Sequence, residues 1–156
     1  MRRGVVAAAS VVLAVVAGCG SSCPSTTGEF TVTYFDGSGS AQVNLTMTLP
    51  LAGSIEYQHC TGATCGTCCH DGDATSATVY GEAQAPGIAS IQPSGDPACP
   101  GDTTESVSIT TSDGRSTSFV CAQIDAARND PANGAAFGKL VDDLRALAAT
   151  QGQRCH

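Results

Sequence analysis

Tryptophan is absent from this 156-residue chain, and large apolar residues are scarce. Leu, Ile, Val and Phe together number 21 in residues 19–156, a fraction typical of chains that bury too little apolar surface to fold. A core this thin normally needs covalent cross-links. The composition therefore predicts a small domain that depends on disulfides or a comparable device.

Basic residues are also few, and no Lys or Arg lies between Gly4 and Gly114. Residues 19–156 carry five basic side chains against 14 acidic ones. An acidic surface repels phosphate backbones, so we expect no nucleic-acid partner. It also lacks a basic patch for an anionic membrane surface, so any membrane attachment needs another device.

Sequence motifs of catalysis are missing as well. The chain has no G-x-S-x-G motif and no glycine-rich loop that could cradle a phosphate. We therefore expect a non-catalytic protein without a cofactor or a metal.

Residues 1–18 have the pattern of a secretory signal peptide. Arg2 and Arg3 form the positive start, and an apolar run follows from Val5 to Ala17. This run is too short to cross about 30 Å of hydrocarbon, which takes roughly 20 apolar residues. It also has no polar face, which disfavours a helix of the folded domain. The run ends at Val16-Ala17-Gly18-Cys19, which resembles the lipobox of bacterial lipoprotein precursors.

The resemblance implies cleavage before Cys19, a diacylglycerol on its sulfur and usually an acylated amine, with chains such as palmitate. Several acyl chains, at about 0.8 kcal/mol per buried CH₂, give stable anchoring to a membrane. The expected location is the cell envelope, and Gly20 after the cysteine favours the outer membrane of a Gram-negative cell. Residues 19–28 would then form a lipidated tether, and residues 29–156 a single domain that meets an unknown envelope partner.

Eight cysteines remain once Cys19 is set aside, and an even number in an oxidising compartment indicates a disulfide framework. We expect four disulfides and no free thiol. Neighbouring cysteines cannot easily bond to each other, because their Cα atoms lie about 3.8 Å apart, short of the usual 4.4–6.8 Å. The eight are Cys23, Cys60, Cys65, Cys68, Cys69, Cys99, Cys121 and Cys155.

Residues 60–70 form the only concentrated cluster of reactive side chains. Besides structural disulfides, two alternatives are a soft-metal site with His59 or His70 and a redox pair at Cys65 and Cys68, which have CxxC spacing. Residues 71–74 are turn formers rather than the helix that follows a thioredoxin-like motif. Structural disulfides are therefore favoured, and their pairing stays open: if one of the two adjacent cysteines bonds to Cys60 or Cys65 within the loop, the other must bond across the fold. A periplasmic thiol-redox or metal-binding protein is the alternative function.

Alternating and β-branched residues predict several strands. Residues 30–35 and 42–49 are expected to pair as a hairpin around the turn 36–40, and residues 54–59 form a third strand. Residues 105–121 form the clearest hairpin, in which a three-residue loop with left-handed Gly114 sets hydrophobic residues on one face. The expected pairs are Val107 opposite Phe119 and Ile109 opposite Thr117.

The stretch between these strands has weaker signals. Residues 60–73 are expected to be a Gly/Cys loop, and residues 75–80 alternate weakly like a strand. Residues 82–101 contain four prolines, so they are expected to form a long loop with one short edge strand.

A C-terminal helix is the strongest prediction, with Asn133 as its N-cap and Gly152 as its stop. Opposite charges off its apolar stripe are spaced as surface ion pairs. The chain therefore predicts an α+β fold: a small antiparallel β-sheet with one C-terminal α-helix packed on it, disulfide-rich. The pairs are Lys139/Asp143 and Asp142/Arg145, and the apolar stripe comprises Phe137, Leu140, Val141, Leu144, Leu147 and Ala148.

Overall fold

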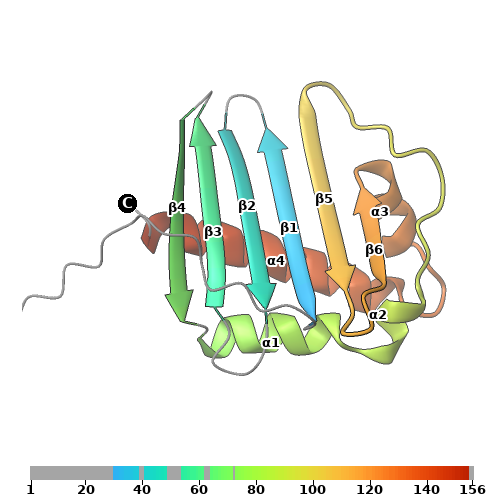
Figure 1. Cartoon of the computed structure of the whole chain (residues 1–156). Coiled ribbons are helices and arrows are strands. Elements are labelled where there is room, and N and C mark those ends of the chain that lie inside the picture. The colour runs from blue at the N-terminus through green and yellow to red at the C-terminus, as the bar shows by residue number, and fades with distance from the viewer. Residues whose placement is uncertain (1–29, 39–40, 49–53, 62–63, 72, 155–156) are drawn as a thin grey trace, which may run out of the picture.

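The computed structural model of the chain describes residues 30–38, 41–48, 54–61, 64–71 and 73–154. In these residues six antiparallel strands form one sheet, in the spatial order β4-β3-β2-β1-β5-β6 (Figure 1). The strands are β1 (Thr31–Ser38), β2 (Ala41–Thr48), β3 (Ser54–Thr61), β4 (Thr64–Asp71), β5 (Thr103–Thr110) and β6 (Ser116–Val120). The helices are α1 (Ala74–Ala83), α2 (Pro86–Ser90), α3 (Ala122–Arg128) and α4 (Gly134–Arg154).

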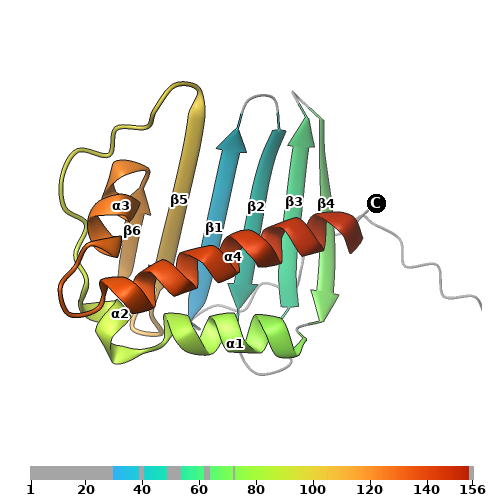
Figure 2. The ribbon, with the colours of Figure 1, turned by 180° about the vertical axis from the view of Figure 1, so that it is seen from behind.

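The two longest helices, α1 and α4, lie against the same face of the sheet. Figure 2 shows α4 running across the strands from β6 toward β4, with α1 beside it along the lower end of the sheet. We call this the helix-covered face; it carries Val32, Tyr34 and Val107. No described helix covers the opposite, uncovered face, on which Ser108 and Ser118 share a hydrogen bond of 2.9 Å between their hydroxyl groups. The expected α+β fold is therefore confirmed.

Two predicted hairpins are confirmed. Strands β1 and β2 pair throughout their lengths, from Thr31 opposite Thr48 to Ser38 opposite Ala41. In the second hairpin Val107 lies opposite Phe119, as predicted, and the amide of Gly114 donates to the carbonyl of Thr111 at 2.8 Å. Gly114 has φ +82°, the left-handed conformation that only glycine adopts without strain.

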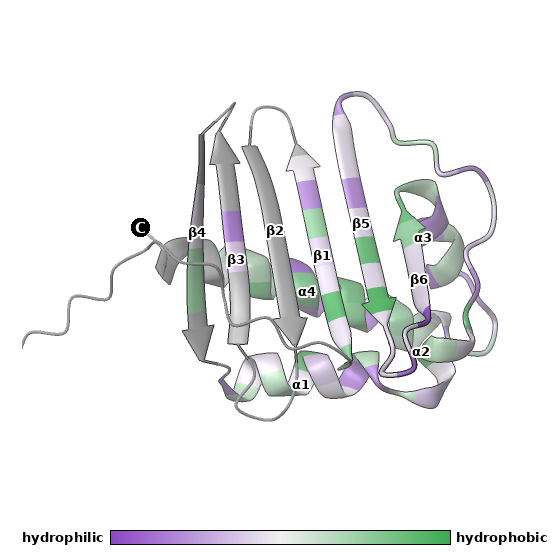
Figure 3. Cartoon of the chain, in the orientation of Figure 1, coloured by the Kyte–Doolittle hydropathy of each residue, from purple (hydrophilic) through white to green (hydrophobic). Residues whose placement is uncertain are grey.

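The core lies between the sheet and α4. All six residues of the predicted apolar stripe are buried, and Leu144 is 0% exposed. The rings of Phe119 on β6 and Phe137 on α4 pack with centroids 4.7 Å apart, which joins the two layers. Figure 3 shows hydrophobic stretches of β1 and β5 in front of the same helix. The two predicted ion pairs on α4 are also present.

The part of the chain between β2 and β5 differs from the prediction. Residues 54–61 and 64–71 form a hairpin, so the expected loop at 60–73 is wrong. Residues 75–80 belong to a helix, not to a strand. Asp73 caps that helix, since its carboxylate accepts from the amide of Ser76 at 2.9 Å while the Ser76 hydroxyl accepts from the amide of Asp73 at 2.8 Å.

Several other helices and strands begin or end at residues that differ from the prediction. Residues 82–101 contain the end of α1 and the short α2 but no strand, because Pro86 suits the first turn of a helix. Strand β1 continues through residues 36–38, which were expected in the turn. Helix α4 does not stop at Gly152 but continues to Arg154. Asn133 directly precedes α4, but its side chain donates to the Ser90 hydroxyl at 3.3 Å instead of acting as the predicted cap.

Candidate functional site

A cleft of about 400 Å³ lies between α4 and the strands β1, β3 and β5. Strand alternation places its sheet residues on the helix-covered face, because Asp36 of β1 pairs with Glu105 of β5 in the antiparallel register. One turn of α4 supplies Arg145, and the next supplies two small alanines that leave space. The lining residues are Tyr34, Asp36, Tyr57, Thr103, Glu105, Arg145, Ala148 and Ala149.

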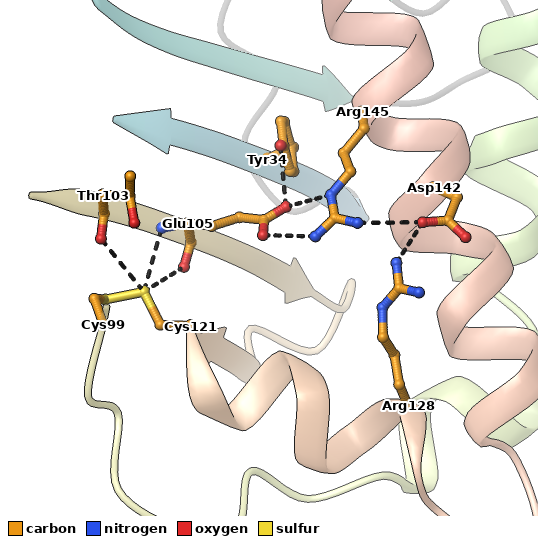
Figure 4. A network of polar contacts seen from close by, with 8 residues as sticks. All are labelled: Tyr34, Cys99, Thr103, Glu105, Cys121, Arg128, Asp142 and Arg145. Carbon is orange, nitrogen blue, oxygen red and sulfur yellow. Dashed lines mark hydrogen bonds and ion pairs between the residues drawn. A yellow bond between two sulfur atoms is a disulfide. The ribbon is translucent and has the colours of Figure 1, made fainter. Parts of the chain in front are cut away.

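Glu105 is the centre of a polar network on the wall of this cleft (Figure 4). One of its carboxylate oxygens accepts from Tyr34 Oη at 3.0 Å and from Arg145 Nε at 2.8 Å, and the other accepts from Arg145 Nη2 at 2.7 Å. Arg145 also donates to Asp142 at 3.3 Å, and Arg128 pairs with the same carboxylate. The fork of Arg145 therefore fixes the orientation of Glu105 with two parallel hydrogen bonds.

The network sets the protonation state of its members. Hydrogen bonds from Arg145 hold the pKa of Glu105 below its ordinary value, against the opposing effect of burial. Burial raises the pKa of Tyr34, and the negative charges of Glu105 and Asp36 raise it further. Glu105 is therefore a charged acceptor and Tyr34 a neutral donor at neutral pH. Such a constellation positions groups, and it offers neither an activated nucleophile nor a general base poised near pH 7.

Asp36 is the acidic group of the cleft that remains available. Among the described residues no hydrogen bond or ion pair to its carboxylate is formed. It lies beside the ring of Tyr34 on the same strand face and opposite the engaged Glu105. The cleft thus presents an unengaged carboxylate, which suits a small cationic group.

A disulfide lies next to Glu105, on the wall of the cleft. Cys99 and Cys121 are bonded, with Cα atoms 5.0 Å apart, and the amide of Cys121 donates to the carbonyl of Glu105 at 2.9 Å. Cys121 has φ +45°, a left-handed conformation that is uncommon outside glycine and that turns the chain from β6 into α3. The bond therefore joins the loop before β5 to the end of β6 beside Glu105 (Figure 4).

The predicted cysteine cluster lies on the β3–β4 hairpin, at the other side of the sheet. Cys60 pairs with Cys65 in the register, Cys68 lies opposite Tyr57, and Cys69 follows on the other face. Both Cys68 and Cys69 are disulfide-bonded. Cys19, Cys23 and Cys155, together with the proposed tether, lie outside the described residues.

Strand geometry decides which partners Cys68 and Cys69 can have. Residues three apart on a strand are separated by about 10 Å, so Cys65 cannot bond to Cys68 within the 4.4–6.8 Å that a disulfide spans. Cys60 is opposite Cys65 and is therefore also about 11 Å or more from both bonded cysteines. This register puts Cys60 and Cys65 out of reach of both bonded cysteines, because the stretch is an extended hairpin and not the compact loop in which such a bond was considered.

A second cavity, of about 740 Å³, lies between α2 and the β5–β6 hairpin. Hydroxyl and apolar side chains line most of it, and its charged groups, Asp113 and Arg115, already pair with each other at 3.3 Å. The described residues contain no cluster of three or more His, Cys, Asp or Glu suited to a metal ion. The cleft at Glu105 is therefore the better candidate for recognition.

Comparison with known proteins gives no relative: no family model matches the chain, and no curated protein matches it significantly. None of the described helices is long and apolar enough to cross a membrane.

Proposed function

We propose that this chain is a lipid-anchored protein of a bacterial cell envelope with a non-catalytic binding role. The observation that carries this proposal is the bonded state of Cys68, Cys69, Cys99 and Cys121. Disulfides persist in oxidising compartments such as the periplasm. This fits the signal peptide and the lipobox-like sequence that ends at Cys19, with the outer membrane as the favoured location in a Gram-negative cell.

Metabolic labelling with a radioactive fatty acid tests the anchor. The wild-type protein should carry label and fractionate with membranes, whereas Cys19→Ser should lose the label and stay unprocessed or soluble. Cys23→Ser is the matched control, because it removes a nearby cysteine outside the lipobox and should keep the label. An unlabelled wild-type protein would end the proposal of a lipid anchor.

The binding role is assigned to the cleft beside Asp36. The unengaged carboxylate and the acidic charge of the chain favour a partner that presents a cationic side chain. Nα-acetyl-lysine amide, which keeps the charged ε-ammonium group, is a suitable probe, and Nα-acetyl-norleucine amide is its uncharged counterpart. We expect the lysine derivative alone to shift the ring resonances of Tyr34 and Tyr57 in NMR titrations.

Variants of two carboxylates make this test specific. Asp36→Asn should abolish the shifts caused by the lysine derivative, and Asp113→Asn, at the exposed turn of the β5–β6 hairpin, should leave them unchanged. Equal shifts from both ligands, or shifts that persist in Asp36→Asn, would remove the cleft from the proposal.

No observation on the described residues favours the alternative of a thiol-redox or metal-binding protein. The CxxC pair lies along one strand at a separation of about 10 Å, too far for the reversible bond that such an enzyme needs. The two cysteines also lie inside strand β4 and not at the N-terminus of a helix, which is the position that lowers the pKa of a reactive cysteine.

A further inference from the structure

We propose that Cys23 is bonded to Cys69, and that the chain between Cys23 and Phe30 is thereby fixed across the lower part of the uncovered sheet face. The inference rests on the proposed function, because it takes Cys19 to be occupied by lipid. It assigns one occupant, residues 24–29 of this chain, to a sheet face that no described helix covers.

Few cysteines can be the partners of Cys68 and Cys69. Cys68 and Cys69 are both disulfide-bonded, and Cys99 and Cys121 are bonded to each other. Adjacent residues of a strand point to opposite faces, so Cys68 and Cys69 do not bond to each other. The register excludes Cys60 and Cys65 by distance, as shown above. With Cys19 lipidated, the available partners are the cysteines near the two ends of the chain, Cys23 and Cys155.

The face of the sheet on which Cys68 lies indicates its partner. Cys68 is buried and lies opposite Tyr57, whose side chain lines the cleft with Arg145, so Cys68 is on the helix-covered face. Helix α4 packs on that face and continues to Arg154, directly before Cys155. Cys155 is therefore the partner expected for Cys68.

Cys69 lies on the uncovered face of the sheet. Cys69 is exposed there, on an edge strand, and is left with Cys23. Cys69 on β4 and Thr33 on β1 lie in the same row of paired residues across the sheet. Three strand spacings, or about 14 Å, separate them. Phe30 precedes Thr33 by three residues, which makes its distance from Cys69 about 17 Å. The seven residues from Cys23 to Phe30 reach about 23 Å when extended, so the chain can span this path.

The bond would change how the domain is attached to the membrane. Cys19 precedes Cys23 by four residues, a reach of about 13 Å from the β4 edge of the sheet. Without the bond the free tether would run from Cys19 to Thr31, with a reach of about 40 Å. The disulfide therefore shortens the tether about three-fold and sets the lipid beside β4, which fixes the orientation of the domain on the membrane.

Peptide mapping of the mature, unreduced protein tests the connectivity. Trypsin is of no use, because no Lys or Arg lies between Gly4 and Gly114, but a protease that cuts after Asp and Glu separates the cysteines. The peptide 57–71 should be linked to both 19–29 and 144–156. The known Cys99–Cys121 bond should link 83–102 to 114–125, because the protease does not cut before Pro97, and it serves as the internal control.

Two neighbouring variants assign the bonds. Cys69→Ser should release peptide 19–29 and keep 144–156 attached, whereas Cys68→Ser should do the reverse. The wild-type map gives an answer even if a variant fails to fold. A wild-type peptide 57–71 without 19–29, or the release of 144–156 by Cys69→Ser, would overturn the inference while Cys19 still carries lipid. If peptide 19–29 remains attached in Cys23→Ser through an unlipidated Cys19, the lipid anchor fails as well.

Discussion

Replacing Leu144 by aspartate probes the contact between α4 and the sheet. Leu144 is 0% exposed and lies in the middle of the apolar stripe. Burying a leucine side chain contributes about 1.5–3 kcal/mol, and truncating one to alanine in a core costs about 2–5 kcal/mol. An aspartate in the same place adds the cost of a buried charge without a partner, several kcal/mol more. Because a domain of this size is stable by only about 5–15 kcal/mol, we expect Leu144→Asp to unfold much of the population.

Urea unfolding followed by circular dichroism, with the disulfides intact, measures the effect. Asp143→Ala is the matched control at the next position of the helix, where the side chain faces solvent and pairs with Lys139. Its loss should change the midpoint little, because exposed ion pairs contribute little. Leu144→Ala should fall between the two. The proposed layer would be wrong if Asp143→Ala lowered the midpoint as much as Leu144→Asp.

Further predictions concern the cleft and its disulfide. Arg145 holds the pKa of Glu105 below its unfolded value, so this pair stabilises the fold above that value, near 4.3, and the stabilisation is lost as the pH falls through the folded pKa. Glu105→Gln should therefore lower the urea midpoint at pH 7 and reduce its difference between pH 7 and pH 3; an unchanged difference would contradict the role of this pair. Cys99→Ser should lower the melting temperature and shift the ring resonances of Tyr34 in NMR spectra, because the bond to Cys121 supports the strand that carries Glu105. Unchanged Tyr34 resonances would separate that bond from the cleft.

Elements with a strong local pattern could be predicted from the sequence. The stripe of α4 repeats over three turns, and every member of it is buried in the structure. In the 105–121 hairpin, matching the apolar faces of the strands led to a three-residue loop, and the register agrees with it. Both elements combine a clear period with a clear boundary, so neighbouring parts of the chain had little influence on the prediction.

Helix α1 and strand β4 were missed because their composition obscured their period. The buried residues Ser76, Val79, Tyr80 and Ala83 recur at helical spacing, but two of them are small or polar, and the weak alternation of residues 75–80 suggested a strand. In residues 64–71 glycine and cysteine replace the usual β-branched residues. Pairing with β3 makes this segment a strand, and a single sequence holds no local signal for that pairing.

The cleft could not have been found from local patterns. Tyr34 and Glu105 are 71 positions apart, and only the β1–β5 pairing brings them together. The spacing of opposite charges along the chain predicts that Arg145 pairs with Asp142 on the helix surface. That contact exists, but the shorter contacts of Arg145 go to the carboxylate of Glu105. Long-range register, rather than residue type, decided where the polar site formed.

The positions of the cysteines follow from where apolar packing is thin. The described core gathers residues of β1, β3, β5 and β6 beneath the helices, but β4 contributes none to that cluster. Of the β4 residues whose exposure the structure describes, only Cys68 is buried, and an edge strand with so little apolar packing frays easily because it pairs along one side only. The bonded cysteines of β4 point to both faces, so covalent links from two directions can hold the strand where packing cannot. The same reasoning explains why reduction should loosen β4 before it disrupts the contact between α4 and β5.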